Sequence, residues 1–282
     1  MKVCIIGICY NAYPDCLKFL QSISNAYNET NNLDLSVVVC DNSSQSSGKE
    51  VIENYFANFG YTYLKLDNIG YFPAFTAGLR ELHTTNESYD LIIVSNVDLT
   101  LDHSFFTQLL NLKISSDVGV IAPSILSLQT RGDINPKIMT RPSKFKLKAL
   151  RYGFSFLPFY RLYNWASVKK AEFKALVGPN LRHADLASSR YPSGTIMYGA
   201  HGSIMLFTKN YLKNGASLNY PRFLFGEEVF VAEEARRKKL LTIYEPSLKV
   251  YDGEHVSTSR ESDRFISGEH VKSYIYLLNK FF

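Results

Sequence analysis

Apolar segments that alternate with helical segments constrain the fold of this chain more than any other feature. Val3–Cys9 is a continuous apolar run, as expected of a strand buried on both faces of a sheet. Further apolar strands are predicted at Leu35–Cys40, Tyr61–Leu66, Leu91–Val94 and Val118–Ser124, with a helical pattern in each interval. This order predicts an α/β fold built from right-handed βαβ units, with a mostly parallel central sheet flanked by helices.

The regular alternation stops near Thr130 and returns in the C-terminal third. Thr195–Phe207 is apolar, Glu227–Lys239 predicts a charged helix, and Ser262–Leu278 predicts a closing helix. The chain has no internal repeat and no low-complexity linker, and its hydrophobic content of 46% is ample for one sizeable core. We therefore expect a single domain over residues 1–282.

Asparagine and aspartate stand at the ends of four predicted strands. These strand ends are Tyr10-Asn11, Asp41-Asn42, Asn68-Ile69-Gly70 and Asn96-Val97-Asp98. Open α/β sheets bind ligands at the edge where the carboxyl ends of parallel strands meet. Amide and carboxylate groups there can accept from a pyrimidine N–H or ribose hydroxyls, and they can ligate Mg²⁺ or Mn²⁺ on a diphosphate. A turn-forming role would explain any one of them, but four in succession favour a nucleotide site.

Two familiar nucleotide-binding motifs are missing from the sequence. No G-x-G-x-x-G follows the first strand, and no G-x-x-x-x-G-K-[ST] occurs anywhere. Rossmann-type dinucleotide binding and P-loop chemistry are therefore disfavoured.

An acidic pair, Glu227-Glu228, opens the predicted charged helix. Acids in a first turn complement the helix dipole, and this explains the pair without any function. The alternative is that one carboxylate is a general base facing the nucleotide site. Because adjacent helical residues point about 100° apart, only one of the two can face that site.

A basic aromatic segment occupies residues 137–174. It holds ten Lys or Arg residues, one acid (Glu172) and nine aromatic residues. Three interpretations compete: a solvated face over a small core, contact with an anionic membrane surface, and nucleic-acid binding. The membrane interpretation is favoured, and no recognised nucleic-acid-binding module surrounds the segment.

Composition and the cysteines indicate the compartment. The formal net charge is +5, and Cys4, Cys9, Cys16 and Cys40 form no C-x-x-C pair. We interpret them as small buried residues in a reducing cytosol. No signal-peptide pattern precedes Val3 and no apolar run approaches about 18 residues. A cytoplasmic location is predicted, with peripheral contact at the inner face of the cytoplasmic membrane.

Taken together, these motifs resemble the family 2 glycosyltransferases, which are inverting enzymes of the GT-A fold. The resemblance runs through most of the chain. It rests on Ile6–Asn11, Val38–Ser44, Asn68–Phe72, Ser95–Asp98, Gly199–Leu206, Gly226–Glu228 with Ala235–Arg237, and Tyr244–Pro246 through His255 and Ser257. The resemblance divides the chain into a nucleotide-sugar-binding half at 1–130, a basic aromatic insertion at 131–190 and an acceptor and catalytic half at 191–282.

The resemblance also assigns roles in the nucleotide half. Asp41 would accept from the base N–H of a uridine or thymidine nucleotide, and Tyr10 and Asn11 would line the same pocket. Asn68, with Gly70 beside it, would contact the ribose or diphosphate. Asp98 would ligate a divalent cation, Mn²⁺ or Mg²⁺, with Asn96 close by.

In the catalytic half, Glu228 aligns with the acid that acts as general base, and Glu227 is the runner-up. Two departures stand out. The family usually has Asp where this chain has Glu228, which moves the carboxylate out by one methylene. The usual metal-binding histidine position falls on Asp252, while His255 lies three residues further on. The third metal ligand is therefore open between His255 and Asp252, with His255 preferred.

The implied function is transfer of a sugar from a UDP- or dTDP-linked donor to a glycan or polyprenyl-diphosphate-linked acceptor, in bacterial O-antigen or capsule synthesis. Two alternatives remain open. A sugar-phosphate nucleotidyltransferase would need a Gly-rich basic loop after the first strand, and Tyr10–Asp15 is not one. A catalytically inactive nucleotide-sugar-binding or scaffold protein would fit the two departures.

Overall fold

The structure is a computed structural model of the chain, and it describes all residues except 46, 84–87, 128–131, 178–190 and 254–260. In the described residues, ten strands form one sheet with the order β3-β2-β1-β4-β9-β6-β10-β5, in which β7 pairs with β6 and β8 with β10. The strands are β1 (Lys2–Cys9), β2 (Asp34–Asp41), β3 (Thr62–Lys65), β4 (Leu91–Asn96), β5 (Leu99–Leu101), β6 (Val118–Ser127), β7 (Gly132–Asp133), β8 (Thr195–Met197), β9 (Ile204–Thr208) and β10 (Leu241–Asp252).

The sheet separates two hydrophobic cores, and β1 contributes to both. Val3, Ile5 and Cys9 pack on one side, whereas Cys4 and Ile6 pack on the other. Successive side chains of a strand point to opposite faces, so a strand buried on both faces must be apolar throughout. This geometry is the physical reason for the continuous apolar run in the sequence.

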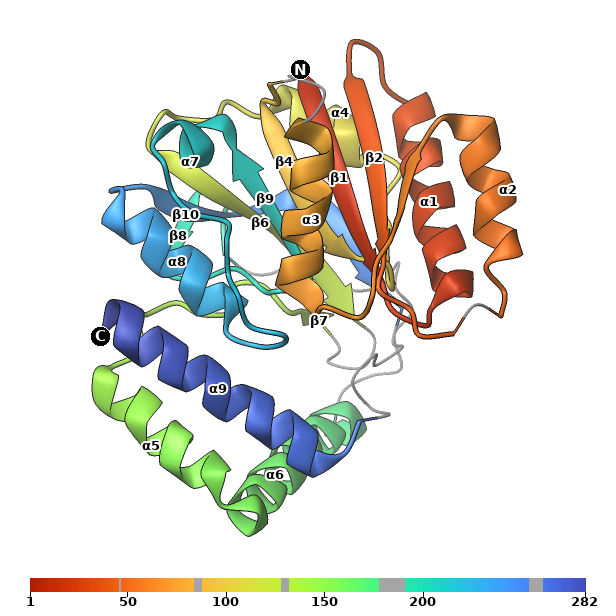
Figure 1. Cartoon of the computed structure of the whole chain (residues 1–282). Helices are drawn as coiled ribbons and strands as arrows, with labels where there is room; N and C mark the ends of the chain where they lie inside the picture. The colour runs from red at the N-terminus through yellow and green to blue at the C-terminus, as the bar shows by residue number, and fades with distance from the viewer. Residues whose placement is uncertain (46, 84–87, 128–131, 178–190, 254–260) are drawn as a thin grey trace.

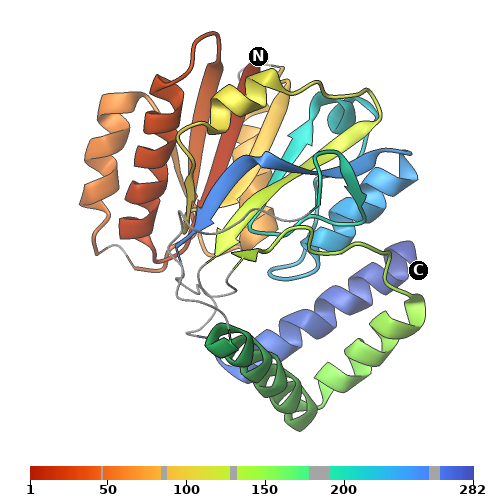
Figure 2. The ribbon, with the colours of Figure 1, turned by 180° about the vertical axis from the view of Figure 1, so that it is seen from behind.

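Helices cover both faces of the sheet (Figures 1 and 2). On one face pack α1 (Tyr13–Asn28), α2 (Glu50–Phe59) and α4 (Phe105–Asn111). On the other pack α3 (Tyr71–His83), α7 (Lys209–Lys213) and α8 (Glu227–Arg237).

Three further helices form a group beyond one end of the sheet. They are α5 (Lys144–Ser155), α6 (Leu157–Val177) and the C-terminal α9 (Asp263–Phe281), and both views show them set off from the strands (Figures 1 and 2). Phe154, Tyr160 and Ile266 form a small core between the three helices. The basic aromatic segment of the sequence therefore supplies two of the three helices in this group.

The expected α/β fold with one central sheet is confirmed, with one difference in strand direction. The pairs β1–β2, β1–β4 and β2–β3 are parallel, as βαβ units require. Strand β9 runs antiparallel between β4 and β6, so the second half of the sheet is mixed. This direction depends on where a distant segment returns to the sheet, which apolar patterning does not determine.

The four cysteines are buried free thiols, as the sequence indicates. Among the helices of the described residues, none is long and apolar enough to cross a membrane.

Candidate active site

A cavity of about 340 Å³ opens at the carboxyl edge of the sheet. Its wall combines strand ends of the first half of the chain with loops and helix starts of the second half. The polar residues of the wall are Tyr10, Asn42, Asn68, Tyr71, Asn96, Asp98, Lys137, His201, Ser203, Glu227, Glu228 and Glu261. Segments distant in the sequence therefore converge on one cavity, as the strand-end pattern predicts.

On the nucleotide side, Tyr10, Asn68 and Gly70 line the cavity where the sequence predicts them. Gly70 has φ +95°, and a Cβ atom at this position would lie 2.4 Å from the Phe223 carbonyl oxygen. Only glycine allows this backbone to approach Phe223 so closely. The close approach joins the two halves of the cavity wall.

Asn42 has a buried acceptor without a protein partner. Its Nδ2 donates to the Gly70 carbonyl oxygen over 2.8 Å, which fixes the orientation of the amide because a carbonyl can only accept. Its Oδ1 is buried and accepts no hydrogen bond from any residue that the structure describes. Asn42 lines the cavity, so a ligand N–H or O–H group can reach this oxygen. An unsatisfied buried acceptor costs about 1–3 kcal/mol, which a donating ligand would recover.

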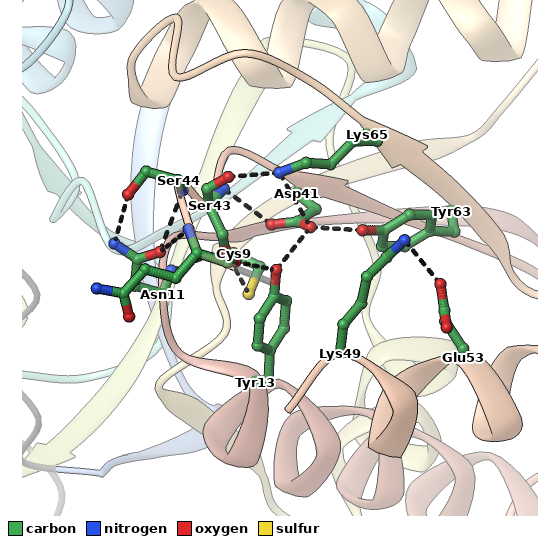
Figure 3. A network of polar contacts seen from close by, with 11 residues as sticks. Cys9, Asn11, Tyr13, Asp41, Ser43, Ser44, Lys49, Glu53, Tyr63 and Lys65 are labelled. Atoms are coloured by element: carbon green, nitrogen blue, oxygen red, sulfur yellow. Dashed lines mark hydrogen bonds and ion pairs between the residues drawn. The ribbon is translucent and has the colours of Figure 1, made fainter. Parts of the chain in front are cut away.

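Asp41, the predicted base-binding residue, is fully buried beneath this edge and is not part of the cavity wall. Its carboxylate accepts from the Ser43 backbone N–H over 2.8 Å, from the Tyr63 hydroxyl over 2.5 Å and from the Tyr13 hydroxyl over 3.1 Å. The Lys65 ammonium lies 3.4 Å away (Figure 3). Burial opposes ionisation, but the hydrogen bonds of Ser43 and Tyr63 and the charge of Lys65 outweigh it and lower the pKa of Asp41. Asp41 thus organises the turn that presents Asn42.

Asn11 also makes hydrogen bonds within the protein that hold a turn in place. Its Oδ1 accepts from the backbone N–H groups of Ser44 and Gln45, each over 3.1 Å, and its own N–H donates to the Ser43 hydroxyl over 2.8 Å (Figure 3). Asn11 is not part of the cavity wall either. The side chain therefore ties the ends of β1 and β2 together.

The Asn96-Val97-Asp98 triplet forms the turn between β4 and β5. All three residues line the cavity, and Val97 also packs in the core. The backbone N–H of Gly253 donates to the Asp98 carbonyl oxygen over 2.8 Å, which brings the end of β10, with Asp252, beside Asp98. Asp252 is not in the wall, and His255 lies outside the described residues.

Glu227 and Glu228 form the first turn of α8 and both line the cavity. Gly226 precedes them in the left-handed region at φ +85°. Gly202 lets Glu227 come close, since a Cβ atom at residue 202 would lie 2.5 Å from Glu227 Oε1. Burial, and then the negative charge of Glu228, raises the pKa of Glu227 to about 8.

Three of the four acidic residues in the cavity wall act electrostatically on one tyrosine. Tyr71 donates to the Gly202 carbonyl oxygen over 2.7 Å. Its pKa is raised, first by burial and then by the negative charges of Glu227, Asp98 and Glu228. The proposed metal ligand and both candidate bases are therefore near enough to act on the same hydroxyl.

Lys137 and His201 belong to the wall but were not among the predicted site residues. Burial, and then the charge of Lys137, lowers the pKa of His201 to about 3, so the imidazole is neutral. The Ser203 backbone N–H donates to His201 Nδ1 over 3.1 Å, which places the ring proton on Nε2. His201 is thus a neutral N–H donor, and the only sequence signal for it is its place between Gly199 and Gly202.

The residues present fit a divalent cation that is shared with a substrate. Within the described residues, no group of three or more His, Cys, Asp or Glu side chains could hold a metal ion by itself. Mg²⁺ and related ions bind through one or two carboxylates plus substrate phosphates rather than in all-protein cages. Asp98 supplies such a carboxylate in the cavity wall, with Asp252 next to its turn.

The chain belongs to Glycosyl transferase family 2, whose pattern matches residues 4–170. The resemblance stated from the motifs is confirmed by this match. No curated protein matches the chain in sequence.

Solved structures show the same GT-A fold at low identity. Residues 1–349 of S. aureus TarS match with TM-score 0.54 and 10% identity over 98% of this chain and 65% of that one. The Pyrobaculum calidifontis mannosyltransferase PcManGT, solved with GDP-Man and Mn²⁺, matches with TM-score 0.50 and 13% identity over 98% of this chain and 70% of that one. GalNAc-T7, solved with UDP, GalNAc and Mn²⁺, matches with TM-score 0.58 and 10% identity over 99% of this chain and 48% of that one. This chain spans only 40% of the longer TarS chain.

Proposed function

We propose that this glycosyltransferase moves a sugar from a UDP- or dTDP-linked donor to a hydroxyl group of a glycan or lipid-linked acceptor, with inversion at the anomeric carbon. The observation that carries the proposal is the shared cavity, in which Asp98 and Glu228 line the same space as the strand ends Tyr10, Asn42 and Asn68. The solved neighbours bound to UDP-GlcNAc or GDP-Man support a nucleotide-sugar donor.

Nucleotide binding is assigned to the wall around Asn42. Its partnerless Oδ1 would accept from the nucleobase N–H or a ribose hydroxyl, with Asn68 nearby for the ribose or diphosphate. The direct base contact predicted for Asp41 would require a ligand to displace one of its present donors. We therefore give the contact to Asn42, and we give Asp41 the role of holding the turn.

Charge balance supports a divalent cation. Among the described wall residues, Asp98, Glu228 and Glu261 are acidic, in addition to Glu227 with its raised pKa, against one Lys or Arg residue, Lys137, and a sugar diphosphate adds further negative charge. Asp98 would hold the cation, with Asp252 or His255 as the second protein ligand, and the bound cation would stabilise the charge that develops on the leaving diphosphate.

Glu228 is the proposed general base. It accepts the proton of the acceptor hydroxyl while that oxygen attacks the anomeric carbon from the face opposite the leaving diphosphate. A single displacement from the opposite face inverts the configuration. Glu227, whose raised pKa keeps it protonated near neutral pH, would be a hydrogen-bond donor beside it.

The cellular role follows only by analogy with the resemblance stated above. A polyprenyl-diphosphate-linked acceptor, as in bacterial O-antigen or capsule synthesis, would be met at the inner face of the cytoplasmic membrane. The basic aromatic segment 137–174 is the part of the chain suited to that location.

A thermal-shift screen of nucleoside diphosphates and nucleotide sugars, with and without Mn²⁺, tests the donor. We expect one nucleotide class to stabilise the protein selectively. Incubation with that donor should release nucleoside diphosphate slowly, and NMR of the transfer product should show the inverted anomer. No release of nucleoside diphosphate would instead favour the inactive nucleotide-sugar-binding protein, and a retained anomer would contradict the single displacement.

A further inference from the structure

Helices α5 and α6 carry a positively charged outer surface rich in aromatic residues. From the start of α5 to residue 170 of α6, the chain contains seven Lys or Arg residues and no Asp or Glu. Large apolar side chains are exposed among them, with 81% of Phe145, 66% of Tyr152 and 60% of Trp165 accessible to solvent. Single exposed apolar residues are ordinary, but a group of them on adjacent helices marks an interaction surface.

Helix α5 is apolar on two opposite sides. Leu147, Leu150 and Phe154 face inward, and Phe154 packs against Ile266 of α9. Phe145 and Tyr152 are seven residues apart, so they share the opposite side, which is exposed. Phe156, which directly follows the last residue of α5, is exposed as well. The inner side accounts for the packing of α5, and the outer aromatic side has no role in the fold.

Helix α6 extends the same surface. Every residue from 161 to 170 is exposed, and the contacts of this stretch include the ion pair of Arg161 with Asp263 and the ring contact of Tyr163 with Phe154. Phe159, Leu162, Trp165 and Val168 recur every third residue, so each apolar side chain lies beside the next in a row that winds around the helix. Lys169 and Lys170 follow this row directly.

We propose that this outer face of α5 and α6 docks on an anionic lipid bilayer. Aromatic side chains favour the boundary between headgroups and acyl chains, and each Lys or Arg near an anionic surface adds about 1 kcal/mol. A second copy of the chain would bind this face poorly, because two identical positively charged surfaces repel each other. The face combines the two features that a charged membrane surface complements.

The docking face is fixed to the rim of the catalytic cavity. Arg161 of α6 pairs with Asp263 at the start of α9 over 3.0 Å, and Phe265 two residues later lines the cavity. Further along α9, the His270 ring stacks on Phe225, another wall residue, with ring centroids 3.8 Å apart. Resting on the function proposed above, docking would hold the acceptor side of the cavity beside a lipid-linked acceptor in the same bilayer.

Vesicle flotation tests this inference without requiring catalysis. The full chain should float with vesicles of phosphatidylcholine and phosphatidylglycerol, should stay down with pure phosphatidylcholine, and should be released by high salt. The charge variant Lys146→Glu, Lys148→Glu, Lys170→Glu and the aromatic variant Phe145→Ser, Tyr152→Ser, Trp165→Ser should each lower the bound fraction at least tenfold.

A matched control variant distinguishes the effect of this face from the effect of the net charge of the chain. Lys113→Glu, Lys213→Glu, Lys238→Glu changes the same number of exposed lysines outside α5 and α6, and it should float like the unmodified chain. Equal loss in both lysine variants, or equal flotation on neutral vesicles, would overturn the proposal. So would a dimer that the aromatic variant dissociates, or RNA that competes with the vesicles for the same face.

Donor binding in the same variants keeps the two proposals apart. Thermal shifts with the nucleotide sugar should be unchanged, because none of the substituted residues lines the cavity. Flotation without donor binding would refute only the proposed function. Donor binding without flotation would refute only the membrane docking.

Discussion

At the scale of single residues, two adjacent glutamates share the cavity in different environments. Glu227 lies against the backbone of Gly202, and its pKa is raised to about 8 by burial and then by the charge of Glu228. Glu227 therefore retains its proton near neutral pH, chiefly because it is buried. A carboxyl group that already holds its proton cannot act as a general base, which favours Glu228 for that role.

Glu228→Gln removes the proton acceptor with little change in size. We expect turnover to fall by about 10²- to 10⁴-fold, the usual contribution of a general base, while donor affinity stays nearly constant. Single-turnover rates and calorimetric donor binding measure the two quantities. Glu227→Gln is the matched control and should keep most of the turnover; a greater loss in that variant would move the base to Glu227.

The pH dependence of stability reports on Glu227. Its pKa in the folded chain, about 8, lies above the ordinary value of 4.5, so between these values the folded state binds more protons than the unfolded state. The free energy of unfolding should therefore decline as pH rises from 4.5 through 8. Glu227→Gln removes this decline, so its melting temperature should match the unmodified chain at pH 5 and exceed it at pH 8.5. A constant difference across this range would contradict the assignment.

The sequence could predict which strand ends meet at the cavity, but not which residue of each turn faces it. Asn68 and Asp98 lie in the turns that follow β3 and β4, and both line the cavity. Asp41 misses the wall by one residue, because the chain turns at the end of β2 and Asn42 points into the cavity instead. Lys137 and His201 reach the wall from segments whose path depends on the whole fold, so no local pattern marks them.

At the scale of elements, the start of α8 depends on packing against α9. Gly226 has φ +85°, and a Cβ atom there would lie 2.1 Å from Ser273 Oγ and 2.7 Å from the Tyr220 hydroxyl oxygen. These two hydroxyls are themselves hydrogen-bonded over 2.7 Å. The glycine thus lets α9 hold the turn that presents both glutamates.

Gly226→Ala should destabilise the chain and lower activity together. The new methyl group meets both the unfavourable φ and a filled space, which adds about 1–3 kcal/mol of overpacking. Gly60→Ala is the control, since Gly60 has φ +68° with nothing within 4 Å of the added Cβ, and it should lose only about 1 kcal/mol. Chemical denaturation of both variants measures the difference. Equal losses in the free energy of unfolding would show that the side chains of Ser273 and Tyr220 move aside at no cost.

Among the elements, the N-terminal ones were the most predictable from sequence. The apolar runs predicted β1, β2 and β4 closely, because a strand buried on both faces has a strong pattern. The three-residue β5 was not predicted, and the start of α3 at Tyr71 depends on a distant residue, because the Tyr71 N–H donates to the Phe223 carbonyl oxygen. Short or tertiary-dependent elements carry too little local signal to be found.

At the scale of the whole molecule, the cavity exists only when both halves of the chain are folded together. Asn42 and Asp98 come from one half, and His201 and Glu228 from the other. A ligand that bridges these halves binds the folded chain and not the unfolded one, so it must raise the melting temperature. Because most of the charged residues in the described wall are acidic, stabilisation by an anionic nucleotide should depend on a cation.

The role of the cation can be measured from the melting temperature with and without Mn²⁺. Nucleoside diphosphate with Mn²⁺ at about a hundred times its Kd should stabilise the chain by about 2.7 kcal/mol, or roughly 5 °C in melting temperature, whereas the nucleotide alone should do much less. Asp98→Ala should abolish the increment that Mn²⁺ adds, because it removes the carboxylate in the wall. Asp117→Ala removes an exposed acid outside the wall and should leave the increment intact. An undiminished Mn²⁺ increment in Asp98→Ala would mean that the cation is held elsewhere, and the charge argument for this cavity would fail with it.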